Sequence, residues 1–291
     1  MKINIYRLLA VVACAIFLAA PACAARKINV MVSIQPLAYF VERIGGERVA
    51  VSVMVPLSSN EHTYEPKPDQ LRALSDAQMY VKVGSNLEFE LTWMDKLRAL
   101  NPDMIICDSA QGIDLMKMKE DVDETQVNYH GVDPHIWLSL RKAKMMVYNI
   151  RNTLIQIDPN HWKEYTDNSD GLIKEMYDLD NEIYDKLVNL KKRTFIVDHP
   201  SWGYFAQDYL LLQLAIESEG KKPAPQDLLA LADQAKHLKL KTIFISSQFN
   251  QENAQAVVGV IKGKLVMIDP LSGDYLNNLR SVMNVLYKAL K

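Results

Sequence analysis

Cysteine is scarce in this chain. Its 291 residues include three cysteines, Cys14, Cys23 and Cys107. The first two lie within or at the edge of an N-terminal apolar segment, so only Cys107 is certain to remain after processing. A single cysteine excludes an internal disulfide and therefore the small folds that depend on one, but a chain of this length can bury a large enough core to fold without it.

The sequence also lacks the compositions of disordered, fibrous and nucleic-acid-binding proteins. Glycine and proline number only 11 and 12, while 49% of the residues are hydrophobic and 23% are charged. These proportions are typical of a globular protein, and no low-complexity tract, Gly/Ser linker or exact repeat is visible. The formal net charge of −2 gives no electrostatic reason to bind nucleic acid or an anionic membrane.

Beyond the N-terminus, the sequence has no apolar run of the roughly 20 residues that a membrane-spanning helix needs. The N-terminus itself has two basic residues, an apolar run over Leu8–Ala20 and the small-x-small sequence Ala22-Cys23-Ala24, the pattern of a cleaved export signal. We expect residues 1–24 to be a signal peptide and the protein to be periplasmic or in the cell envelope. Lipidation at Cys23 or Cys14 is the alternative, because a small residue precedes each cysteine.

Strand and helix patterns alternate along most of the chain. The alternation indicates βαβ units, so we expect an α/β fold of two lobes, each with a four-stranded parallel sheet flanked by helices. The predicted strands are 28–34, 49–55, 79–83 and 104–107 in the first lobe, and 194–197, 211–216, 242–246 and 265–268 in the second. The predicted helices are a short one from Pro36 to Gly45-Gly46, then 69–76, 88–100, 204–209, 225–237, 251–262 and 275–290.

Between the two lobes the pattern is helical. Apolar or small residues from Trp162 to Leu190 recur every three or four positions, which indicates one buried stripe. We expect a single helix over Asn160–Leu190, about 46 Å long at a rise of roughly 1.5 Å per residue, to join the lobes. The predicted divisions are a signal peptide at 1–24, an N-terminal lobe at 25–139, a helical segment at 140–192 and a C-terminal lobe at 193–291.

Three of the six histidines stand where predicted strands end. His62 follows the second strand, His135 follows the fourth, and His199 ends the first strand of the second lobe. Asp269 ends the last strand of that lobe. Because open parallel sheets bind ligands beyond the carboxyl ends of their strands, we expect these side chains to meet between the lobes. Three imidazoles and a carboxylate suit Zn²⁺ better than Mn²⁺ or Fe²⁺. Their position at strand ends alone does not exclude that each of these four residues is a structural polar residue rather than a ligand.

An acidic residue precedes each of the three histidines within two positions: Glu61, Asp133 and Asp198. Such carboxylates are available to orient the imidazoles or to replace a ligand. Cys107 ends a predicted buried strand, and we expect it to belong to the core. No Gly-rich phosphate loop, nucleophile elbow or HExxH motif is present.

Four motifs resemble those of the metal-type solute-binding proteins of ABC importers, the zinc and manganese carriers of the bacterial envelope. The resemblance covers Lys27–Lys291 and implies two lobes bridged by a rigid helix, a membrane permease as partner, a monomer and no enzymatic activity. It also implies that metal is held by His62, His135, His199 and Asp269. Manganese-type members tend to use Glu as the third ligand, so His199 implies zinc. The motifs are Glu61-His62-Thr63-Tyr64-Glu65-Pro66 with Pro68, Asp133-Pro134-His135-Ile136-Trp137-Leu138-Ser139, Asp198-His199-Pro200-Ser201-Trp202-Gly203-Tyr204-Phe205 and Ile268-Asp269-Pro270-Leu271.

The resemblance leaves alternatives open. Some relatives use the acid directly before the first histidine, so Glu61 is the alternative to Asp269 as fourth ligand. Many zinc-type members have a long His-rich loop before the second ligand, whereas residues 108–132 here are acidic with His130 alone. We expect this loop to be solvated rather than metal-gathering. The alternatives to a zinc carrier are a zinc-dependent hydrolase with Glu61 as general base, a manganese carrier, or an adhesin-like relative.

Overall fold

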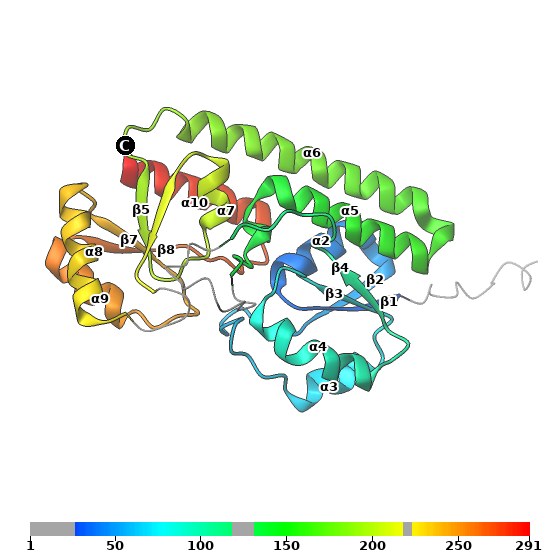
Figure 1. Ribbon diagram of the computed structural model, residues 1–291. Helices are drawn as coiled ribbons and strands as arrows, with labels where there is room; N and C mark the ends of the chain where they lie inside the picture. Colours follow the sequence, from blue (N-terminus) through cyan, green and yellow to red (C-terminus); the bar gives the residue numbers. More distant parts are fainter. Residues whose placement is uncertain (1–26, 118–130, 218–222) are drawn as a thin grey trace, which may run out of the picture.

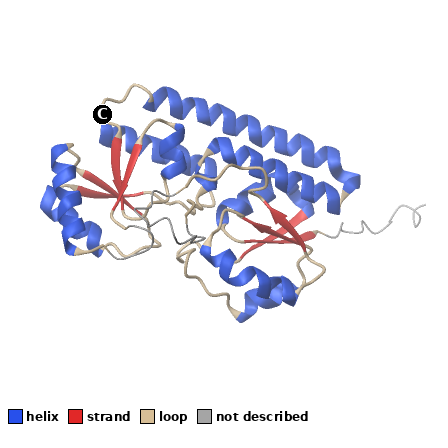
Figure 2. Cartoon of the chain, in the orientation of Figure 1, coloured by secondary structure: helices blue, strands red, loops and turns tan. Residues whose placement is uncertain are grey.

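The computed structural model describes residues 27–117, 131–217 and 223–291, and these form two lobes beneath a long helix (Figure 1). Each lobe has one four-stranded parallel sheet with helices on both faces (Figure 2). The predicted fold class is therefore confirmed. The predicted signal peptide and residues 118–130 of the acidic loop lie outside the described residues, and the predicted domain limits stay predictions. Within the described ranges, no helix combines the length and the hydropathy that a membrane crossing requires.

The first sheet has the strand order β2-β1-β3-β4, and the second has the equivalent order β6-β5-β7-β8. In each sheet the second strand in sequence pairs on one side of the first strand, β1 or β5, and the third strand pairs on its other side. Such a switch point leaves a crevice beyond the carboxyl ends of the strands. The strands of the first sheet are β1 (Ile28–Val32), β2 (Val49–Val53), β3 (Met79–Lys82) and β4 (Ile105–Asp108). Those of the second are β5 (Thr194–Val197), β6 (Leu212–Ala215), β7 (Thr242–Ile245) and β8 (Lys264–Met267).

The helices alternate with these strands, as βαβ units require. Those of the first lobe are α2 (Gln35–Gly45), α3 (Pro68–Ser75) and α4 (Glu88–Leu100). Those of the second lobe are α7 (Gly203–Asp208), α8 (Pro225–His237), α9 (Glu252–Ile261) and α10 (Tyr275–Leu290). Short 3₁₀ turns occupy Gly46–Arg48, Ile136–Leu138 and Pro159–His161. Cys107 is buried in the core, as expected.

Two helices, α5 (Leu140–Ile157) and α6 (Trp162–Leu187), form the segment between the sheets. The predicted helix over Asn160–Leu190 is too long at both ends. It starts at Trp162, after a 3₁₀ turn opened by Pro159. Its end follows from Arg193, whose guanidinium donates hydrogen bonds to the carbonyls of Leu187 and Val188 and so satisfies acceptors at the helix end.

Helix α6 packs against both lobes. Its 26 residues extend about 39 Å, and its buried face contacts α2 of the first lobe and α10 of the second (Figure 1). Arg43 of α2 pairs with Glu175 at 2.6 Å, and Arg280 of α10 pairs with Glu182 at 3.0 Å. One continuous helix therefore supports both sheets and limits how far they can move apart.

Candidate metal centre

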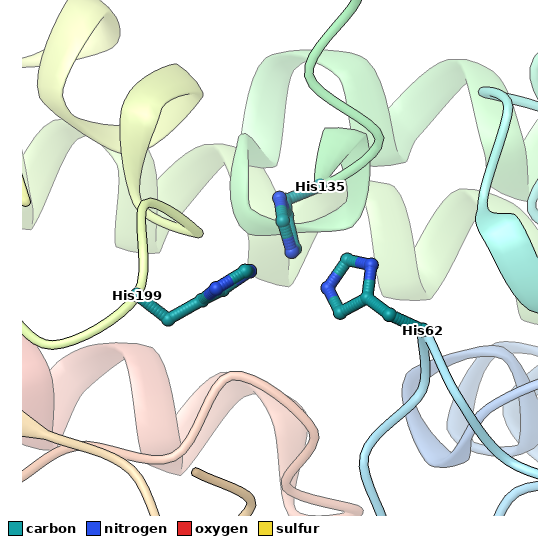
Figure 3. Close-up of side chains that lie close together, drawn as sticks. All are labelled: His62, His135 and His199. Atoms are coloured by element: carbon teal, nitrogen blue, oxygen red, sulfur yellow. The ribbon is translucent and has the colours of Figure 1, made fainter. Parts of the chain in front are cut away.

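Three histidines from different loops meet between the lobes. His62 lies between β2 and α3, His135 lies just before the 3₁₀ turn that leads into α5, and His199 lies between β5 and α7. One ring nitrogen of each lies within 4.8 Å of the corresponding nitrogen of the other two. Figure 3 shows the three rings pointing toward a common centre. The structure thus brings together the three histidines singled out in the sequence.

A carboxylate stands behind each ring. His62 Nδ1 lies 2.5 Å from Glu88 Oε2, and His135 Nδ1 lies 2.7 Å from Asp133 Oδ1. His199 Nδ1 lies 3.3 Å from Glu217 Oε2. A carboxylate accepts a hydrogen bond from Nδ1–H, so each contact favours the tautomer with its lone pair on Nε2. The carboxylates therefore orient all three lone pairs toward the same point.

The three Nε2 atoms are buried, and none has a hydrogen-bond partner among the described residues. A buried polar atom without a partner is costly, and three at one point are exceptional in a folded protein. Nitrogen lone pairs that converge in this way are the donor set of a transition-metal cation such as Zn²⁺. The residues present therefore fit a metal ion.

Glu61 adds a carboxylate beside this donor set. Its side chain is fully buried, and neither of its oxygens has a hydrogen-bond partner within the part of the chain described. Its Oε1 lies 3.7 Å from His62 Nε2 and 3.9 Å from His135 Nε2. Burial raises the pKa of Glu61 above its ordinary value. A cation bound by the imidazoles would favour the ionised form of this carboxylate.

Asp269, the fourth residue expected from the sequence, is not a member of the three-residue group. Its Oδ1 accepts hydrogen bonds from Gln248 Nε2 at 3.0 Å and from the backbone N–H of Leu271 at 2.9 Å. Asp198 likewise binds backbone groups, because it accepts hydrogen bonds from the N–H of the adjacent His199 and from the N–H of Ser246, which follows the neighbouring strand β7. Of the three acids that precede histidines, Asp133 is the one that orients its neighbouring imidazole.

The other two orienting carboxylates were not predicted from the sequence. Glu88 is the first residue of α4, after β3, and Glu217 follows β6. Both lie beyond the carboxyl ends of strands, which is the signal that identified the histidines. Phe249 was missed as well: its ring stacks on His199 at a centroid distance of 4.0 Å and an interplanar angle of 11°.

The pKa values differ among the three imidazoles. Burial lowers the pKa of His199 to about 3, and burial together with the charge of His62 holds the pKa of His135 well below its ordinary value. Burial also acts to lower the pKa of His62, but the hydrogen bond to Glu88 and the charges of Glu61 and Glu88 outweigh it and raise that pKa. As pH falls, His62 is therefore the first of the three to take up a proton.

A family model and curated proteins match most of this chain. Residues 30–289 match the family model described as zinc-uptake complex component A, periplasmic. The high-affinity zinc uptake system protein ZnuA of Bacillus subtilis is 27% identical over 256 residues, which cover 85% of this chain and 79% of the relative. The manganese-binding lipoprotein MntA of Halalkalibacterium halodurans is 26% identical over 231 residues, which cover 77% of this chain and 72% of that protein.

Solved structures give the same result. A crystal structure of ZnuA superimposes with a TM-score of 0.86 at 40% identity, and the match covers 91% of this chain and all 100% of the other. The laminin-binding protein of Streptococcus agalactiae, described as bifunctional with adhesin and metal-transporting activity, matches with a TM-score of 0.80 at 26% identity. That match also covers 91% of this chain and 100% of the other.

Proposed function

The chain belongs to the family of periplasmic zinc-uptake component A proteins, and from this premise we propose that it captures Zn²⁺ outside the cytoplasm and delivers it to an ABC importer. The observation that carries the proposal is the convergence of three buried, unpartnered Nε2 atoms from His62, His135 and His199 (Figure 3). Two of these imidazoles have lowered pKa values and are neutral at neutral pH, as metal ligands must be.

Zinc is the cargo that the donor set favours. Three imidazole nitrogens suit a borderline cation that accepts four ligands, whereas Mn²⁺ prefers more oxygen donors. One relative is named for manganese, so the proposal concerns preference between two metals within one family. The third histidine, His199, supports zinc in this chain, in line with the implication drawn from the motif.

For the fourth ligand, the contacts favour Glu61, the reverse of the preference for Asp269 drawn from the sequence. Both Glu61 oxygens are buried without partners, and Oε1 faces two of the three nitrogens. Asp269 already has two hydrogen bonds on Oδ1. We propose that Glu61 completes the coordination shell, while Asp269 as ligand stays the competing prediction.

A buried site supports a carrier rather than the hydrolase considered as an alternative. Hydrolysis requires an open coordination position that water and substrate can reach. Here His135 is 1% exposed and Glu61 is fully buried. Four protein ligands in such a place would form a closed shell, which holds a metal without activating water.

The partner proposed is the permease of an ABC importer, and the location proposed is the periplasm or the cell envelope. The family description and the uptake-system name of a relative support both. Lipoprotein anchoring is supported by relatives that are named lipoproteins, one for manganese and others for zinc. An additional adhesive role is supported by laminin-binding structural neighbours from two streptococcal species.

The test removes two ligands together. The double variant His62→Ala, His199→Ala is compared with the wild type and with His237→Ala, which changes an exposed histidine of α8. Zn²⁺ is titrated against a chromophoric chelator. We expect tight one-to-one binding by the wild type and His237→Ala, and loss of the tight site in the double variant. Unchanged affinity in the double variant would refute the proposal.

A further inference from the structure

Hydrogen bonds join the chain segment around His135 to helix α7, which follows His199. The Tyr204 hydroxyl, on α7 just after His199, donates to the carbonyl of Asp133 at 2.9 Å and accepts from the N–H of Met116 at 2.8 Å. The Ser139 hydroxyl, just after His135, donates to Asp208 Oδ2 at the end of α7, at 2.5 Å. These contacts lie on either side of His135 in the sequence. The two histidines are therefore held as one unit.

A glycine permits the close packing at this junction. A Cβ atom at Gly203 would lie 2.5 Å from Asp133 Oδ2 and 2.7 Å from Met116 Cε, which is closer than real Cβ contacts. The start of α7 therefore lies directly against the carboxylate that orients His135. Close packing of this kind resists separation of the two segments.

The loop that carries His62 has fewer hydrogen bonds to the second lobe than the segment that carries His135. Within the described ranges, one hydrogen bond links the loop after β2, which carries Glu61 and His62, to the second lobe: Gln248 Nε2 donates to the Leu57 carbonyl at 2.8 Å. The same Nε2 donates to Asp269 Oδ1 at 3.0 Å. Two oxygen acceptors around one nitrogen fix the orientation of this amide. Gln248 lies after β7 and is 9% exposed.

We infer that Gln248 holds the Glu61–His62 loop against the paired histidines through its hydrogen bond to Leu57, and that metal release begins when this hydrogen bond breaks. Glu61 and His62 then leave together, since they are adjacent on one loop, while His135 and His199 stay paired. The inference rests on the proposed function, because it concerns the release of the captured metal. Gln248 acts as a positioning residue through Leu57 and Asp269, and contacts no ligand nitrogen in the structure.

The test replaces the amide without changing its volume much. Gln248→Met deletes both hydrogen bonds and keeps an unbranched side chain of similar size, and Gln234→Met on the exposed face of α8 is the matched control. The rate of Zn²⁺ dissociation is measured by stopped flow with an excess of chelator. We expect Gln248→Met to release Zn²⁺ about three- to tenfold faster than the wild type, as the loss of hydrogen bonds of ordinary strength predicts, with an association rate within about twofold.

A second variant tests whether the attachment of the Glu61–His62 loop, rather than the attachment between His135 and His199, controls the release rate. Tyr204→Phe removes the hydroxyl that joins α7 to Asp133 and keeps the ring, and we expect it to change the dissociation rate less than Gln248→Met does. Dissociation from Gln248→Met at the rate of Gln234→Met would overturn the inference, and so would an equal or larger effect of Tyr204→Phe. Absence of tight Zn²⁺ binding by the wild type would instead refute the proposed function. Thermal melting of the metal-free proteins verifies that each variant folds.

Discussion

The imidazoles of the centre face one point because a carboxylate stands behind each of them. Glu88, Asp133 and Glu217 contact the Nδ1 atoms of His62, His135 and His199. This arrangement sets the tautomer in the absence of metal, so we expect binding to require no reorientation of the rings. Replacement of such outer carboxylates typically weakens metal binding by about 10- to 100-fold.

We expect His62 to make metal binding dependent on pH. A protonated imidazole cannot bind a metal, and the pKa of His62 is raised above the ordinary value of about 6.5. As pH falls through this raised pKa, protons compete for His62, and we expect the Zn²⁺ affinity to fall about tenfold per pH unit. His199, with a pKa of about 3, does not add to this slope near neutrality. Chelator competition between pH 5 and 8 measures it.

Glu88→Gln is the variant that identifies the cause of this pH dependence. It removes the carboxylate that raises the pKa of His62, so the fall in affinity should begin at lower pH than in the wild type. Glu42→Gln, at an exposed position of α2, is the control. An onset that does not move in Glu88→Gln would show that another group sets the pH dependence.

Single substitutions also distinguish Glu61 from Asp269 as the fourth ligand. Glu61→Gln keeps the shape of the side chain and removes its charge, and we expect Zn²⁺ affinity to fall at least about tenfold. Asp269→Asn should weaken binding less, because Asp269 Oδ1 is already engaged by Gln248 and Leu271. Competition titrations on both variants make the comparison. The opposite order of effects would restore Asp269 as the fourth ligand.

At the scale of elements, the long helix α6 supports both lobes. Leu179 lies on its buried face and is 1% exposed. We expect Leu179→Ala to lower the free energy of unfolding of the metal-free protein by about 2 to 5 kcal/mol, through lost apolar contacts and the cavity left behind. Leu229→Ala, at a position 59% exposed on α8, should cost less than about 0.5 kcal/mol. Urea denaturation compares them, and equal costs would contradict the packing described.

The elements themselves were largely predictable from local patterns. The ranges 88–100, 194–197, 225–237 and 275–290 match α4, β5, α8 and α10 at both ends. The largest error concerns the limits of α6, because its C-terminal carbonyls are satisfied by Arg193, a side chain outside the periodic stripe. Periodicity reports which face is buried, but not which distant group ends the helix.

The site was predictable where it depends on topology and not where it depends on tertiary packing. His62, His135 and His199 follow strand ends, and the carboxyl ends of parallel strands lie at one edge of a sheet. Glu88 and Glu217 are 26 and 18 residues away from the histidines that they contact. Spacing along the chain cannot give such pairings, because the packing of neighbouring loops decides them.

The two sheets of the molecule share one continuous helix, and loops from both lobes form the candidate metal centre. Helix α6 contacts both α2 and α10, so the lobes can tilt but not swing widely apart. We expect a small displacement of the Glu61–His62 loop to be enough for metal release, because all the ligands must stay within bonding distance at once. Capture and release would then depend on the position of this loop rather than on a wide separation of the lobes.

We propose that this chain holds one Zn²⁺ in preference to Mn²⁺ at the three-histidine centre. The most direct measurement is a competitive titration of the metal-free wild type with Zn²⁺ in the presence of excess Mn²⁺, with the bound metal quantified after separation. We expect one tightly bound Zn²⁺ per chain and little Mn²⁺. Retention of Mn²⁺ against Zn²⁺, or the lack of any tightly bound metal, would contradict it.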